Sequence, residues 1–108
     1  MPDLDQLLVA VSHHARRSIL ARLKRGPLRV TEVAAPFDLS LNAVSKHLKM
    51  LEAAGLIRRE RQGREHLIHL QPEALRHVAD WVHGYEAAWN HQLDRLEAHF
   101  QAKQRSKP

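Results

Sequence analysis

The sequence predicts a mainly α-helical chain with one small β-hairpin, and three observations support this fold class. Apolar residues recur every three or four positions through most of the 108 residues. Between Gly55 and Pro72 the period changes, and a basic turn separates two short apolar runs. The last segment, of about 32 positions, is again helical and would measure about 48 Å. With 44% hydrophobic residues, the chain has enough apolar surface for one compact core.

Two helices are predicted at the start of the chain. Their apolar residues, which recur at helical spacing, are Leu4, Leu7, Leu8 and Val11 in the first and Ala15, Ile19, Leu20 and Leu23 in the second. Ser12 is an N-cap type for the second helix. Gly26, followed by Pro27, ends it.

A short helix from Thr31 to about Pro36 precedes the most informative segment, a helix over residues 40–54 that Gly55 ends. One side of this helix is apolar and predicted to be buried, and the other is polar. The buried stripe is Leu41, Val44, Leu48 and Leu51, and the polar side holds Asn42, Ser45, Lys46 and Lys49.

Residues 57–70 are predicted to form the hairpin, with its turn at Gln62 and Gly63. Pro72 then begins a final helix that runs to about Lys103, and residues 104–108 are predicted to be a basic disordered tail. Three helices followed by a hairpin are the parts of a winged helix-turn-helix. We therefore predict one such domain over residues 1–103, which includes an N-terminal and a long C-terminal dimerisation helix.

The charge of the chain is uneven and favours a polyanionic partner. The formal net charge is +5, and residues 40–64 hold six basic side chains against two acidic ones. Residues 72–100 hold five acidic side chains against two basic ones. We expect residues 40–64 to contact phosphate and residues 72–100 to avoid it.

Several classes of function are disfavoured by composition. The chain has no cysteine, which excludes disulfides, thiolate metal sites and thiol nucleophiles. Four scattered glycines make no phosphate-binding loop, and no catalytic motif is recognisable, so we do not expect an enzyme. No segment is apolar enough to cross a bilayer and no basic leader precedes the first apolar run, so a cytoplasmic location without a membrane partner is expected.

The polar side of the 40–54 helix has the chemistry to read double-stranded DNA. Asn42 can pair with adenine and Lys46 can donate to guanine, while small Ala43 permits close approach. Ser40, Ser45 and Lys49 can hold phosphate. The arginines around the turn would repel one another without a polyanion, and they are Arg58, Arg59, Arg61 and Arg64.

Three segments closely resemble the ArsR/SmtB family of bacterial winged-helix repressors. The run SLNAVSKHLKMLEAAGLIRR (residues 40–59) resembles the family's recognition helix, RQGRE (61–65) its wing and HARRSILARL (14–23) its second helix. The resemblance covers about residues 4–100 and implies a homodimeric repressor on a two-fold symmetric operator. Carried over by position, it implies groove contacts by Ser40, Asn42, Ala43, Ser45, Lys46 and Lys49, and wing contacts by Arg61, Gly63 and Arg64.

The final helix carries a long apolar stripe that needs a partner. Its members advance by three or four positions and are Val78, Trp81, Tyr85, Trp89, Leu93, Leu96 and Phe100. A body of this size, with a radius of gyration of about 13 Å, is too small to cover the whole helix. We predict a two-fold dimer in which this helix and the helix of Leu4, Leu7 and Leu8 meet their copies.

Two alternatives concern the nine histidines. The resembled family can bind metal through cysteines in its third helix, and that site cannot exist here because the chain has no cysteine. A second family site lies across the paired final helices of a dimer. Its low-probability candidates here are Asp80, His83, His91 and Asp94, whose spacing departs from the family's pattern. We predict no cofactor, and the alternatives are a metal-responsive repressor or a histidine-rich metal-binding or interaction module that does not bind DNA. A pH response through His47, His66 and His69 is a further hypothesis, in which acidification tightens operator binding. The inducer, the operator and the target genes are not readable from the sequence.

Overall fold

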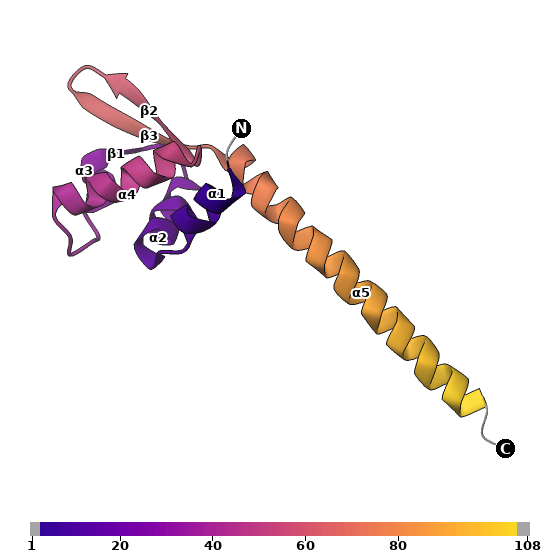
Figure 1. The fold of residues 1–108 in the computed structure, drawn as a ribbon. Coiled ribbons are helices and arrows are strands. Elements are labelled where there is room, and N and C mark those ends of the chain that lie inside the picture. The colour runs from indigo at the N-terminus through magenta and orange to yellow at the C-terminus, as the bar shows by residue number, and fades with distance from the viewer. Residues whose placement is uncertain (1–2, 106–108) are drawn as a thin grey trace. The chain divides into compact units, whose positions relative to one another are not determined.

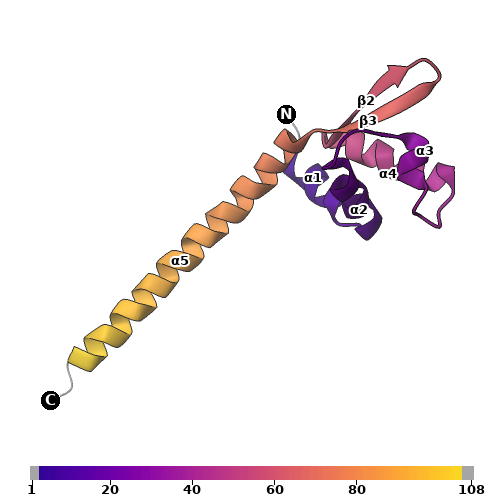
Figure 2. The same ribbon diagram turned by 180° about the vertical axis from the view of Figure 1, so that it is seen from behind.

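The computed structural model describes residues 3–105, and the two N-terminal helices have the predicted positions (Figures 1 and 2). Helix α1 spans Leu4–Val11 and α2 spans His14–Leu23. The predicted N-cap is wrong by one residue. Ser12 ends α1, and the ring of His13 caps α2 by accepting a hydrogen bond from the Ala15 amide at 3.0 Å. The loop between α1 and α2 is therefore only Ser12 and His13.

Helices α3 (Val30–Ala34) and α4 (Leu41–Ala53) follow, close to the predicted ranges. The Ser40 hydroxyl caps α4 by accepting from the Ala43 amide at 3.1 Å. Gly55 lies just beyond α4 with φ of 78°, a conformation that glycine adopts without steric cost. The chain can therefore turn sharply from α4 into the first strand of the hairpin.

The sheet has three strands, one more than the predicted hairpin. Strands β2 (Ile57–Gln62) and β3 (Glu65–Leu70) are antiparallel, with Gln62 opposite Glu65 across the turn. The short strand β1 (Leu28–Arg29) pairs with the other edge of β3, so the order is β1-β3-β2. Two residues are too short for a periodic pattern, which is why β1 was not predicted. The fold is the predicted mainly α-helical winged helix-turn-helix, and β2 and β3 extend from the helical body as the wing (Figure 1).

The core lies among α1, α2, α3, α4 and the base of the sheet. Val44, Leu48 and Leu51 of α4 are fully buried, as predicted. Leu41 is not, because it occupies the first turn of α4 beyond the edge of the core, and it is 59% exposed. Leu7, predicted to meet a second copy, is 0% exposed and belongs to the core of its own chain.

The last helix starts with a short 3₁₀ turn. Pro72–Ala74 form this turn, η1, and α5 continues over Leu75–Arg105. The described chain separates into two compact units, one ending at Val78 and the other beginning at Ala79. The first two positions of the predicted tail are helical, and 106–108 lie outside the described residues. Across residues 3–105, no helix is long and apolar enough to span a membrane.

Candidate nucleic-acid interface

Helix α4 presents its polar side to solvent. Because Val44, Leu48 and Leu51 are held in the core, the helical period turns the opposite side outward. On that side, Asn42, Lys46 and Lys49 are exposed, and Ala43 and Ser45 are half-buried. Within the first unit, no element among residues 3–78 occludes this polar flank.

Ser40 has a structural role as well as a candidate binding role. Its Oγ accepts the hydrogen bond from the Ala43 amide, which stabilises the first turn of α4. A hydroxyl also carries one proton to donate. The capping geometry therefore leaves Ser40 able to donate to a phosphate oxygen beside the start of α4.

The wing places its arginines on two different faces, because side chains alternate along a strand. In β2, Arg59 and Arg61 share the face of buried Ile57, and Arg58 lies on the other face. Arg59 is half-buried, and its Nε lies 3.2 Å from the Glu52 carboxylate of α4. Arg59 therefore ties the wing to α4, a role that the predicted phosphate-binding cluster did not include.

The tip of the wing is a tight turn through Gly63 and Arg64, one residue later than predicted, because Gln62 still belongs to β2 and pairs with Glu65. Gly63 has φ of 63°, and the Arg61 Nε donates to its carbonyl oxygen at 3.2 Å. The Arg64 side chain is exposed and has no carboxylate within 4.0 Å among the described residues. Arg64 thus projects a cation with open donors from the end of the wing.

The outer face of the wing also carries a carboxylate, which would repel a phosphate backbone. The His69 Nε2 lies 2.6 Å from Glu60 Oε2, from the adjacent strand. This hydrogen bond, with smaller contributions from Gln62 and Arg58, holds the pKa of Glu60 below its ordinary value. The Glu60 carboxylate is therefore ionised and hydrogen-bonded to His69. A protonated His69 ring offsets part of the negative charge of this carboxylate.

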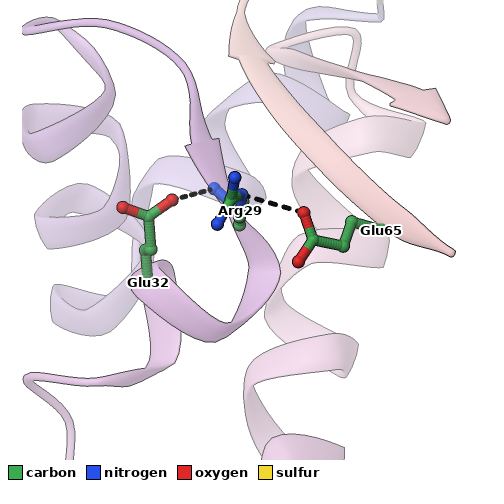
Figure 3. Close-up of polar contacts among 3 residues, drawn as sticks. All are labelled: Arg29, Glu32 and Glu65. Atoms are coloured by element: carbon green, nitrogen blue, oxygen red, sulfur yellow. Dashed lines mark hydrogen bonds and ion pairs between the residues drawn. The ribbon is translucent and has the colours of Figure 1, made fainter. Parts of the chain in front are cut away.

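A residue that the sequence interpretation missed, Arg29, links the wing to α3 (Figure 3). The Arg29 Nε lies 2.9 Å from Glu65 Oε2 of β3, and its backbone amide donates to Glu32 Oε1 at 3.0 Å. A hollow of about 260 Å³ opens beside it. It is lined by Arg29, Val30, Thr31, Arg59, Arg64, Glu65 and His66. Arg29 and Arg59 are already paired with Glu65 and Glu52, so Arg64 is the arginine of this hollow that has no carboxylate within 4.0 Å among the described residues.

Beneath α4, a buried arginine joins three helices. Arg16 is 6% exposed, and its Nε donates to the Ala10 carbonyl at 2.7 Å and its Nη2 to the Val9 carbonyl at 3.0 Å. Its Nη1 lies 3.2 Å from His47 Nδ1 on α4. Arg16 therefore connects the end of α1 through α2 to α4. Its place on the stripe of Ile19 and Leu23 was a visible signal of burial.

His47 is half-buried, and its ring contacts this arginine. Burial, together with the positive charges of His13 and Arg16, lowers the pKa of His47 below its ordinary value. The ring of His13 contacts it at a tilt of 47°, with centroids 4.7 Å apart. His47 thus stays neutral to a lower pH than an ordinary histidine, which weakens the hypothesis that it adds charge for DNA binding near neutrality.

Helix α5, taken by itself, exposes the predicted apolar stripe. Val78 is half-buried against the core of the first unit. The other members are between 43% and 65% exposed, and they are Trp81, Tyr85, Trp89, Leu93, Leu96 and Phe100. Trp81 and Tyr85 contact edge to face, with centroids 5.3 Å apart. On α1, Leu4 and Leu8 are half-buried.

The candidate metal ligands also lie on α5. Asp80, His83, His91 and Asp94 are all exposed, and His83 Nδ1 lies 3.2 Å from the Glu86 carboxylate. Within residues 3–105 of the single chain, no three His, Asp or Glu side chains are grouped so that they could hold a metal ion. A site shared by two copies stays a prediction.

This chain is similar in sequence to helix-turn-helix transcriptional regulators. A family model described as a helix-turn-helix domain matches residues 11–60. The HTH-type transcriptional regulator Rv2034 of Mycobacterium tuberculosis is 38% identical over 71 residues, 66% of either chain. The HTH-type transcriptional repressor SmtB of the same organism is 36% identical over 73 residues, covering 68% of this chain and 54% of the relative. This chain therefore spans between about half and two thirds of these relatives.

One solved structure aligns over a greater length. The crystal structure of an ArsR family transcriptional regulator is similar with a TM-score of 0.77 and 36% sequence identity. The similarity covers 81% of this chain and 96% of that chain. It therefore extends to nearly the whole of the other protein.

Proposed function

This chain belongs to the ArsR family of helix-turn-helix transcriptional regulators, and from this premise we propose that it represses transcription as a homodimer on a two-fold symmetric DNA operator. The observation that carries the proposal is the unobstructed polar flank of α4 beside a wing with arginines at its tip. A helix with such a flank fits the major groove of B-DNA, and the wing then lies along the adjacent backbone.

Within this proposal, the side chains of α4 divide by chemistry. Asn42 reads adenine and Lys46 donates to guanine, because amide and ammonium groups match the base edges in the major groove. Ser45 and Lys49 contact phosphate, and Ser40 adds the donor that its capping bond leaves open. Half-buried Ala43 keeps the approach close.

The wing supplies phosphate contacts that do not read sequence. Arg64 is the principal contact, because it is exposed at the tip and has no carboxylate partner there. Arg61 and Gly63 shape the turn, and Arg58 faces the backbone on the outer side of the strand. Arg59 acts by holding the wing against α4 through Glu52. This assignment separates binding arginines from a positioning arginine.

The dimer is proposed to form through the stripe of α5, and Leu4 and Leu8 of α1 are proposed to meet their copies as well. Six large apolar side chains along one helix would remain in water in a monomer, which is unusual for a soluble protein. A second copy of the helix buries the same surface by two-fold symmetry. Two copies of α4 then face two half-sites.

The experiment begins by identifying the bound DNA. Genome-wide footprinting of the full chain gives the operator, and fluorescence anisotropy then gives its affinity as a function of salt. The slope of log K against log salt falls by about 0.9 for each phosphate contact removed. We expect Arg64→Ala and Lys49→Ala each to lower the slope by about one contact. Lys46→Ala should weaken binding and relax the preference at one base position.

The matched control is Arg95→Ala, which removes an exposed cation from α5. Its slope should equal that of the unaltered chain. If the Arg64 and Lys49 variants bind with unchanged slope, neither side chain contacts phosphate and the proposed docking is wrong. If footprinting finds no protected DNA, the proposal as a whole is overturned.

A further inference from the structure

A second cavity lies away from the candidate DNA interface, in the body of the first unit. Its volume is about 430 Å³, within the range of about 300–1,000 Å³ that is typical of small-molecule sites. The end of α1, one side of α2, the end of β3 and the turn into α5 form its walls. The lining residues are Val11, Arg17, Leu20, Ala21, Lys24, Leu70, Pro72 and Leu75.

The walls of this cavity are aliphatic. Leu20 is buried, and Val11, Leu70 and Leu75 are half-buried at its surface. The face that α2 contributes runs from Arg17 to Lys24, a distance of about 10 Å along the helix axis. The cavity is therefore an apolar groove beside α2, and its aliphatic walls suit a hydrocarbon chain.

Both ionisable side chains at the groove are cationic. Arg17 and Lys24 are seven positions apart on one face of α2, and both are exposed. The Arg17 Nη1 donates to the Val11 carbonyl at 2.8 Å, which holds the guanidinium at the groove and leaves its other donors open. Neither cation has a carboxylate within 4.0 Å among residues 3–105. The rim is thus complementary to a negative charge.

We propose that this groove binds an aliphatic carboxylate, with its hydrocarbon chain along α2 and its head group at Arg17 or Lys24. A carboxylate satisfies the open donors of a guanidinium with two parallel hydrogen bonds. Burial of the hydrocarbon chain against the leucines supplies the apolar part of the affinity. The site is separate from the proposed DNA contacts and does not depend on them.

The test is calorimetric titration of the full chain with decanoate, with decyltrimethylammonium as the probe of opposite charge. We expect decanoate to saturate one site per chain and the ammonium probe not to saturate. Ala21→Phe fills the groove from an exposed position and should weaken decanoate binding at least tenfold. Arg17→Gln or Lys24→Gln should weaken it about two- to fivefold, the range for one exposed charge pair.

Arg25→Gln is the matched control, because Arg25 is adjacent to Lys24 but does not line this groove. Its decanoate affinity should be unchanged. The proposal is overturned if decanoate does not saturate, or if it binds the Ala21 and Lys24 variants as tightly as the unaltered chain. It is also overturned if Ala21→Phe dissociates a dimer in sedimentation while decanoate fails to bind, since a second copy then covers the groove.

Discussion

Replacement of Arg16 by methionine tests whether the buried guanidinium holds the helical body together. Methionine keeps an unbranched apolar stem but is shorter than arginine, and it removes every donor. The Val9 carbonyl retains donors from Ser12, whose Oγ lies 2.6 Å away. The Ala10 carbonyl loses its 2.7 Å bond to Arg16 Nε in a buried position. An unsatisfied buried carbonyl costs about 1–3 kcal/mol, and the other two lost bonds contribute about 1 kcal/mol each.

The apolar side chain recovers part of this loss, because methionine carries no charge to desolvate. We therefore expect Arg16→Met to lower the free energy of unfolding by about 2–4 kcal/mol. That is a large share of the total of about 5–15 kcal/mol that is typical of natural domains.

The control is the adjacent Arg17→Met, which removes an exposed side chain with one hydrogen bond, to the Val11 carbonyl. Its loss should be less than about 1 kcal/mol. Urea unfolding, followed by far-ultraviolet circular dichroism at one fixed protein concentration, measures both variants. Equal losses for Arg16→Met and Arg17→Met would refute the reasoning, because burial would then have no bearing on the contribution of the arginine.

Two further predictions concern pH and assembly. Because the folded-state pKa of His47 is lowered, its unfolded state binds the proton first as pH falls below about 6.5. The free energy of unfolding should then decrease on acidification, with a slope of at most about 1.4 kcal/mol per pH unit from this one group. His47→Gln keeps an acceptor for Arg16 and should flatten that part of the profile, and an unchanged slope in urea unfolding would exclude His47 as its source. Trp89→Asp places a charge in the middle of the α5 stripe and should yield monomers in analytical ultracentrifugation, while Ala87→Asp on the opposite face of the same helix should not. Persistence of the dimer in Trp89→Asp would place the interface elsewhere.

The helices were largely predictable because their periodic apolar residues enter one core. Val44, Leu48 and Leu51 show this for α4, since each is fully buried. Leu41 has the same spacing but lies at the end of the helix, where the core no longer reaches. Periodicity gives a direction around the helix axis, and it does not say how far along the axis the neighbouring elements extend.

The residues of the candidate site were predictable from the sequence, but the contacts that join them to other helices and strands were less so. The exposed polar side of α4 follows from local spacing. The pairing of Arg59 with Glu52, and of Arg29 with Glu65, depends on how the strands lie against the helices. Strand β1 forms because residues 28–29 pair with the free edge of β3, and no local sequence pattern predicts this pairing. Contacts between distant segments are therefore the part that required the structure.

Two ion pairs hold the wing in place, and they influence how the DNA of an operator would have to deform to fit both α4 and the wing. Arg59 with Glu52 and Arg29 with Glu65 anchor β2 to α4 and β3 to the turn before α3. Each pair adds little free energy by itself, and we expect the two together to restrict motion between α4 and the wing. Under the proposed function, any mismatch in spacing within a half-site would be met by bending of the duplex. The stiffness of base steps outside the contacted positions would then change the binding affinity, so the protein would prefer some operator sequences over others.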